Sequence, residues 1–389
     1  MENKELKAII QAVTDEQRIR KGESHRREAL FKVPPLLKDE KKLFLEQSQL
    51  VDEWLEQYSV NTGNPLKDEK RLDELAKEWN ALLNSIKFPI DNVTTKTRYT
   101  DSHTQKGVLE RVQGCLFGMA AGAWLNAITR EYSPSENAFS SLVWNIPFTW
   151  KPDDGIELAL ALANSLIKEK MFKPEAVYYA YLTWMLSRPF KENRPILTGI
   201  GEKTSTLLRT AVLACFGRNC ELTQVIHWCA LNVKITHPDP ICVFANEIYA
   251  VAVFFALKSG NPEELYEKTI EWGFKSENQE KTVLEALLRA STSPQNAPSQ
   301  GAICSLQNAF YQLLHAKTLT EGILSCVEDT FPVDRAICGA LLGATYGEKA
   351  FPEEWKKVLQ SSPLGEKRPP DYQPHNIFLI AEKLIASCI

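Results

Sequence analysis

Residues 150–167 read Trp150-Lys151-Pro152-Asp153-Asp154-Gly155-Ile156-Glu157-Leu158-Ala159-Leu160-Ala161-Leu162-Ala163-Asn164-Ser165-Leu166-Ile167. A proline and two adjacent carboxylates lead into a long Ala/Leu run, which predicts a largely buried helix with Asp153 or Asp154 as its N-cap. An acid at a helix start accepts hydrogen bonds from the first-turn N–H groups and favours the positive end of the helix dipole. Capping therefore explains both acids, unless other parts of the chain give them a chemical role.

The composition is that of a globular chain without a general preference for anionic partners. Its 389 residues, 44% of them hydrophobic, are enough for a sizeable core in one large domain or two unequal ones. With 45 basic and 49 acidic residues the net charge is -4, which gives no general attraction to nucleic acid or to an anionic membrane. Any anionic ligand therefore needs a local site.

The cysteines and the N-terminus indicate a reducing compartment. Nine cysteines are scattered among apolar residues without a C-x-x-C pair, which is typical of buried thiols and not of a disulfide framework or a zinc site. The chain opens with charged residues, and no uncharged apolar span of about 18 residues occurs. We expect no membrane span, and either a cytoplasmic protein or one delivered to a cytosol without a cleaved signal peptide.

Helical periodicity predicts an all-α fold in three parts. Residues 1–87 are expected to form an amphipathic helical N-terminal extension, 88–106 a linker, and 107–389 an all-helical domain. The extension either packs against the domain or binds a protein partner. Within the domain, further helical segments are expected over 173–187, 203–216, 221–233, 238–259, 262–273, 278–291, 303–315, 318–328, 333–347, 353–360 and 375–388.

Three glycines lie four residues apart in the first helical segment of this domain. Gly114, Gly118 and Gly122 share one helix face, and each costs about 1 kcal/mol relative to alanine in a helix. Something must approach that face closely, either a second helix or a ligand lying against bare backbone. The second alternative makes Gly114 and Gly118 candidate substrate-binding residues.

Two further segments are candidates for substrate contacts. Gly201 precedes Thr204, Ser205 and Thr206 at a predicted helix start, where N–H groups and hydroxyls would converge on a phosphate. An ordinary Ser/Thr helix cap is the alternative. His237, between Thr236 and Pro238, is either a turn residue or a ligand contact.

Five motifs, taken in order, resemble the ADP-ribosylglycohydrolase family, the all-helical enzymes that remove ADP-ribose from modified side chains such as arginine. They are the helix with Arg111, Gly114, Leu116 and Gly118; the pair Asp153-Asp154; Arg209, which resembles the arginine that closes the family's substrate-loop motif; Thr236-His237-Pro238-Asp239-Pro240; and the helix from Ile337 to Gly347. The resemblance covers residues 107–389. It implies a compact orthogonal multi-helix domain, hydrolysis of an ADP-ribosyl bond, and Mg²⁺ held by threonine hydroxyls and carboxylates near the ribose.

The departures from the family pattern fall on the metal ligands. Where the family has Thr-Asp-Asp-Thr, this chain has Pro152 and Gly155 beside the two acids. The later Asp-Thr-Asp-Thr set falls on residues 330–333, flanked by Asp329 and Asp334. The resemblance leaves Asp153, Asp154 and Asp334 as metal candidates, and we expect one Mg²⁺ ion or none, since Mg²⁺ demands near-ideal octahedral oxygen geometry.

Three functions are compatible with these features. The first is a hydrolase that releases ADP-ribose from protein side chains, arginine first among them, with Asp153 and Asp154 as catalytic residues. The second is a module that binds ADP-ribose or an ADP-ribosylated protein without chemistry. The third is an interaction protein that uses its N-terminal helices. Adjacent acids favour the first, whereas the altered metal ligands favour the others.

Overall fold

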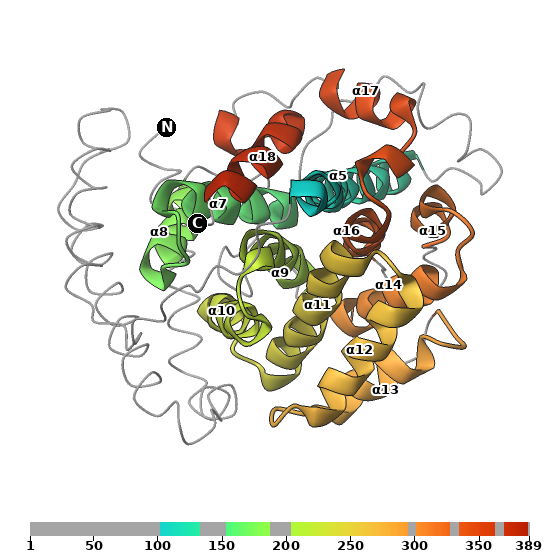
Figure 1. Ribbon diagram of the computed structural model, residues 1–389. Coiled ribbons are helices and arrows are strands. Elements are labelled where there is room, and N and C mark those ends of the chain that lie inside the picture. The colour runs from blue at the N-terminus through green and yellow to red at the C-terminus, as the bar shows by residue number, and fades with distance from the viewer. Residues whose placement is uncertain are drawn as a thin grey trace.

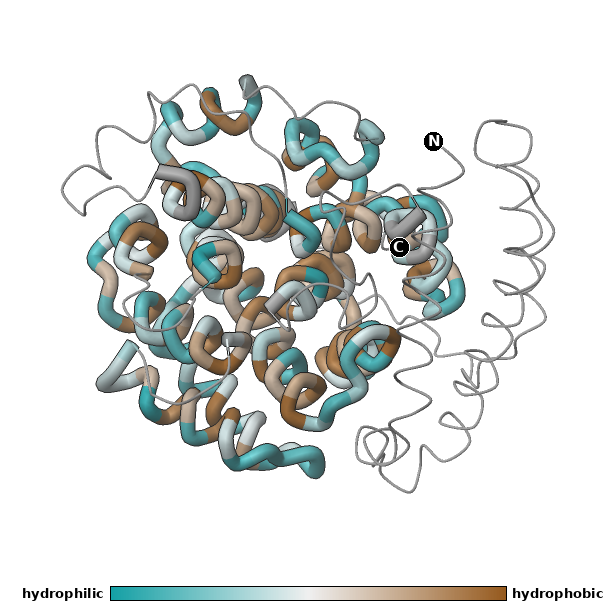
Figure 2. The backbone as a smooth tube through the Cα atoms, turned by 180° about the vertical axis from the view of Figure 1, so that it is seen from behind, coloured by the Kyte–Doolittle hydropathy of each residue, from teal (hydrophilic) through white to brown (hydrophobic). Residues whose placement is uncertain are grey.

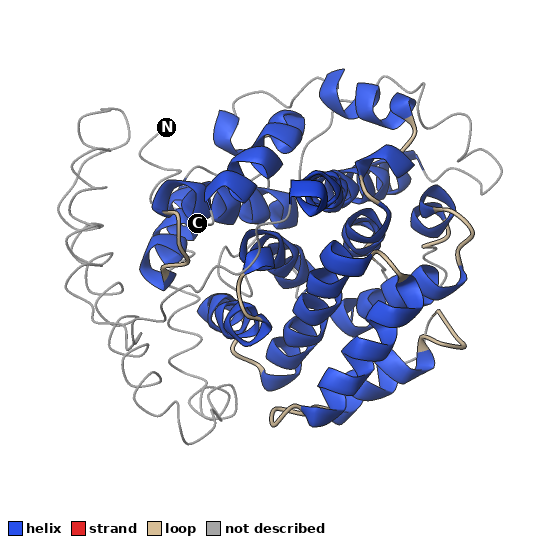
Figure 3. Ribbon diagram, viewed as in Figure 1, coloured by secondary structure: helices blue, strands red, loops and turns tan. Residues whose placement is uncertain are grey.

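Helices are the only regular elements in the part of the chain that the structure describes (Figure 3). This computed structural model describes residues 102–132, 153–186, 204–294, 301–326, 334–361 and 369–387. The longer helices are α5 (Ser102–Tyr132), α7 (Asp154–Glu169), α8 (Pro174–Leu186), α9 (Thr204–Phe216), α10 (Leu222–Thr236), α11 (Pro240–Ser259), α12 (Pro262–Lys275), α13 (Lys281–Arg289), α14 (Gly301–His315), α15 (Leu319–Leu324), α16 (Arg335–Tyr346), α17 (Glu353–Ser361) and α18 (Ile377–Ser387). The all-α prediction is confirmed.

The helices predicted between residues 173 and 388 all occur, with shifted ends. The helix expected over 221–233 runs on to Thr236, and the helix expected over 318–328 ends at Leu324. α5 begins at Ser102, inside the segment expected to be a linker. The N-terminal extension, 1–87, and the rest of that linker lie outside the described residues.

α11 lies at the centre of the helical body (Figure 1). It packs against α9, α10, α12 and α16. Asp239 caps its start by accepting a hydrogen bond from Ile241 N at 3.2 Å, and Pro240 supplies a preset first-turn φ. By length and composition α11 could cross a membrane, but other parts of the protein bury 83% of its apolar window. That burial is the environment of a core helix.

Outer helices show the patterns that place them against this centre. Hydrophilic and hydrophobic residues are interspersed along α13 and α17 (Figure 2), and α13 buries Val283, Leu284, Ala286 and Leu287. Such a one-sided apolar stripe drives a surface helix onto a core. The apolar stripe of α13 is accordingly found beside α11, α12 and α14.

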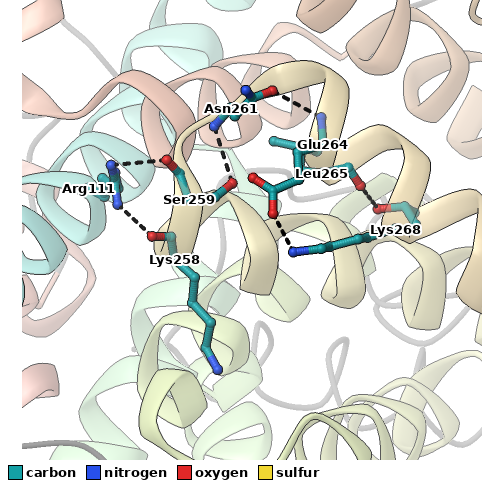
Figure 4. A network of polar contacts seen from close by, with 8 residues as sticks. Arg111, Lys258, Ser259, Asn261, Glu264, Leu265 and Lys268 are labelled. Atoms are coloured by element: carbon teal, nitrogen blue, oxygen red, sulfur yellow. Dashed lines mark hydrogen bonds and ion pairs between the residues drawn. The ribbon is translucent and has the colours of Figure 1, made fainter.

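Arg111 joins α5 to the end of α11 (Figure 4). Its Nη1 donates to the backbone carbonyls of Leu257 and Lys258 at 3.3 and 3.1 Å, and its Nη2 to that of Ser259 at 3.4 Å. These are carbonyls that a helix end leaves without intrahelical partners, so the guanidinium satisfies them and opposes the negative end of the dipole. Gly260 then leaves the helix at a left-handed φ of 64°. The arginine that opens the first family motif is therefore used here to fasten two core helices.

α5 and α16 touch backbone to backbone. A Cβ built on Gly118 would overlap the carbonyl oxygen of Gly339, and one on Gly339 would overlap that of Gly118. Gly114 and Gly343 repeat the same reciprocal contact one turn along. Because glycine has no side chain, α5 and α16 approach each other more closely at these positions than any other residue type would permit.

Glu247 is a buried acid on α11 whose charge has little compensation. Its side chain is 3% exposed, Asn278 Nδ2 donates to Oε1 at 3.5 Å, and Oε2 has no hydrogen-bond partner among the described residues. Burial raises the pKa of Glu247 to about 7, although Lys234 and the bond from Asn278 act in the opposite direction. An acid whose folded pKa lies above its unfolded value opposes folding once it is ionised.

Glu247→Gln should therefore change how stability depends on pH. Below about pH 4.5 the acid is neutral in both states; as pH rises toward 7 the unfolded state ionises first, so the unsubstituted protein loses stability relative to the variant. The difference should reach about 3 kcal/mol in favour of Gln by pH 8. Denaturant unfolding between pH 4 and 8 measures it, with Glu267→Gln on the exposed side of α12 as control. A constant difference across that range would contradict the buried-acid account.

Candidate functional site

The start of α7 presents the two adjacent acids. Asp153 is the N-cap, in an extended backbone conformation, and its Oδ1 accepts a hydrogen bond from Ile156 N at 3.0 Å. Asp154 is the first helical residue, where the helix dipole favours a negative charge. Both acids are half-buried, whereas the helix that follows them is almost entirely buried. The cap thus fixes the orientation of one carboxylate beside the other.

The start of α9 lies directly against the start of α7. A Cβ on Gly155 would lie 3.4 Å from Ser205 Cβ and 3.0 Å from Leu208 Cδ1. The small residue after the acids therefore lets the two helix starts meet, at the position where the family pattern has a threonine. The structure thus places the helix start that carries Asp153 and Asp154 beside the helix start that carries Ser205, although the two segments are separate in sequence.

Thr204 and Thr206, two of the predicted substrate contacts, lie in the first turn of α9. Thr206 is fully buried, and its Oγ1 accepts a hydrogen bond from Asn246 Nδ2 at 2.8 Å. Asn246 Oδ1 in turn accepts from Thr210 Oγ1 at 2.8 Å. Thr206 is thus used inside the α9–α11 contact, which leaves the expected phosphate contact from this hydroxyl without support. Thr204 is the first residue of α9, and Gly201 lies outside the described residues.

His237 follows α10 in the short segment that connects it to α11, and it lies beside a hydrogen bond from α9. Its Nδ1 lies 2.9 Å from Thr236 Oγ1, and Arg209 Nη2 donates to the same hydroxyl oxygen at 2.7 Å. His237 is only 7% exposed. Two of the sequence motifs, the arginine and the Thr-His turn, are therefore one hydrogen-bonded unit in the structure.

Gly114 and Gly118 have a packing role that accounts for them without a ligand. The backbone of α16 occupies the helix face on which a substrate contact was predicted. Gly122 continues the same contact against Arg335 at the start of α16. Assigning Gly114 and Gly118 to substrate binding has no support in this geometry, because a helix lies where the ligand was expected.

Asp334 is the N-cap of α16. Its Oδ1 accepts hydrogen bonds from Ala336 N at 2.9 Å and from Asn126 Nδ2 at 2.8 Å. The Asp334 backbone N–H donates to Ser305 Oγ at 2.9 Å. One oxygen of this carboxylate thus stabilises the helix start and ties it to α5, a use that competes with metal ligation.

The donors in the described residues do not fit a dinuclear magnesium site. Within these ranges, no three His, Cys, Asp or Glu side chains gather closely enough to hold a metal ion. Asp153 and Asp334 each have one carboxylate oxygen in a helix cap. Asp329, the other acid beside the altered ligand set, lies outside the described residues.

Sequence reasoning missed the polar partners inside the core. Asn246 bridges α9 and α11, and Asn126 bridges α5 and α16. Both are fully or nearly fully buried, and each interrupts an apolar helix. A lone amide in such a helix was the available signal, since a buried amide needs partners. Those partners lie on other helices, so the sequence of one helix does not identify them.

The fold is that of a hydrolase family that acts on ADP-ribose linkages. The family model described as ADP-ribosylglycohydrolase matches residues 104–386. The chain belongs to the ADP-ribosylglycohydrolase family.

Solved structures agree at the level of the fold. An "ADP-ribosylglycohydrolase-related protein complex" is 21% identical and superposes with a TM-score of 0.56. The match covers 73% of this chain and all of that one. No curated protein matches the chain.

Proposed function

We propose that this protein is a hydrolase that releases ADP-ribose from ADP-ribosylated protein side chains, with arginine as the first candidate. The observation that carries the proposal is the pair Asp153 and Asp154, half-buried at the start of α7, where the next residue, Gly155, packs against Ser205 of α9. Carboxylates perform this chemistry as general bases and as electrostatic stabilisers of an oxocarbenium-like ribose. Family membership supports the reaction class.

In the proposed reaction, the two acids divide the work. One carboxylate accepts a proton from the attacking water, while the pair stabilises the positive charge that develops on the ribose. The water oxygen bonds to the ribose carbon as the bond from that carbon to the side-chain nitrogen breaks. The nitrogen takes up the proton that the carboxylate accepted from water, so that free ADP-ribose and the unmodified side chain are released. The cap on Asp153 keeps its carboxylate oriented without a ligand present. We propose one Mg²⁺ ion or none beside these acids, and no step is assigned to it.

A module that binds ADP-ribose or an ADP-ribosylated protein is the second candidate. It is favoured by the use of Asp153 and Asp334 oxygens in helix caps and by Pro152 and Gly155 beside the acids. In either case we propose an ADP-ribosyl ligand and a cytosolic site of action. The eight described cysteines are all buried, as expected of thiols in a reducing compartment.

Incubation with arginine-ADP-ribosylated protein tests these alternatives. The purified full chain, with and without a chelator, is mixed with the modified protein, and free ADP-ribose is quantified. Release supports the hydrolase, and retention of bound substrate without release supports the binding module. Sensitivity to the chelator decides whether a metal takes part.

A further inference from the structure

A buried polar cluster lies where α8, α9 and α10 meet. It consists of Tyr181, Arg209, Asn232 and Thr236, and we call it the Arg209 cluster. Arg209 is fully buried, its guanidinium carbon lies 4.9 Å from the centre of the Tyr181 ring, and Nη2 donates to Thr236 Oγ1 at 2.7 Å. The Tyr181 hydroxyl donates to Asn232 Oδ1 at 2.6 Å. Three side chains from α8 and α10 thus lie around the one positive charge, which α9 supplies.

The Arg209 cluster has more hydrogen-bond donors than acceptors. Arg209 Nε, Arg209 Nη1 and Asn232 Nδ2 are buried and have no hydrogen-bond partner within the described ranges. All three are nitrogen donors, and a guanidinium does not lose its proton in a protein. These three donors of the Arg209 cluster therefore lack an acceptor.

The positive charge also lacks a protein counter-ion. No ion pair joins Arg209 to a carboxylate in the part of the chain that the structure describes. Two buried acids on helices that pack against α9 have other partners: Glu157 Oε2 accepts from Trp184 Nε1 at 2.7 Å, and Glu247 Oε1 from Asn278. A buried charge is costly unless it is paired and hydrogen-bonded.

We propose that the Arg209 cluster binds a small inorganic anion of halide size, held by Arg209 and Asn232. A water molecule would supply lone pairs but no charge, whereas an anion supplies both and accepts several N–H groups at once. Arg209 and Asn232 are both fully buried, so the donors are closed to a nucleotide phosphate and suit a single atom such as chloride. The proposal is independent of the reaction assigned to Asp153 and Asp154.

Thermal unfolding of the unmodified protein tests the proposal. Measurements in sodium chloride and in sodium gluconate at equal ionic strength should differ, with a melting temperature higher by roughly 2 °C or more in chloride and a rise that saturates. Crystals soaked in bromide should show an anomalous peak within hydrogen-bond distance of Arg209 and Asn232. The absence of both effects would leave a cluster filled with water and overturn the proposal.

Asn232→Asp locates the anion within the protein. One oxygen of the new carboxylate can keep the bond from Tyr181, while the other replaces the unpartnered amide nitrogen and supplies the missing negative charge. The variant should lose the chloride-dependent shift, whereas Arg289→Met, at an exposed position of α13, should retain it. A full chloride effect in Asn232→Asp would place the anion elsewhere. If this variant does not fold, the measurements on the unmodified protein decide the question.

Discussion

A protein with both Asp153→Asn and Asp154→Asn should keep its melting temperature, whereas its rate of ADP-ribose release should fall by ~10²-fold or more. Asparagine caps a helix about as well as aspartate, so α7 should still begin at the same residue, at a cost well under ~1 kcal/mol. The side-chain shape remains, but the charge and the proton acceptor are gone. Release of ADP-ribose from arginine-modified protein, together with a melting curve, measures both effects.

The control for that double variant is Asp371→Asn. Asp371 is exposed, and its backbone carbonyl accepts from Asn164 near the other end of α7, so its carboxylate has no part in the α7 start. Its substitution should leave both activity and melting temperature unchanged. Equal activity in the double variant would remove the catalytic assignment and leave the binding module as the better account.

The second large effect is expected at the contact between α5 and α16. Gly118→Ala should destabilise the protein by about 3 kcal/mol or more, because the added methyl group would overlap the backbone carbonyl of Gly339. A side chain could move aside, but a helix backbone cannot do so without disturbing its neighbours. Urea unfolding at neutral pH measures the change.

Gly107→Ala provides a control of opposite sign on the same helix. A Cβ at Gly107 meets no atom within 4 Å, so alanine should gain the usual helix preference, about 0.5–1 kcal/mol. If the face at Gly118 instead received a ligand, alanine there would also raise stability and weaken only binding. The sign of the Gly118 effect therefore separates helix packing from ligand contact.

The helices could be predicted from sequence because their signals are local. The proline and acids at 152–154 specify where α7 begins, and Gly260-Asn261-Pro262 specify the break between α11 and α12. Each of these caps depends on residues within one turn. Helix ends were less predictable, as α10 shows by continuing to Thr236.

The site was harder to predict because its contacts join distant segments. Periodicity placed Gly114 and Gly118 on one face but contained no sign that α16 would occupy it. Thr206 was predicted at a helix start, yet its partner Asn246 lies on α11. A pattern along one helix indicates which face is buried, while only the assembled helices decide what lies against it.

The reciprocal glycine contact also bears on how the chain folds during synthesis. Gly118 and Gly339 are separated in sequence by more than half of the chain, and each contacts the backbone of the other. α5 emerges from the ribosome long before α16, and contacts between remote segments form slowly because a large loop must close first. Until α16 has been made, the first core helix has no surface against which to complete its packing. A ribosome-bound chain truncated before Arg335 should therefore remain protease-sensitive at α5.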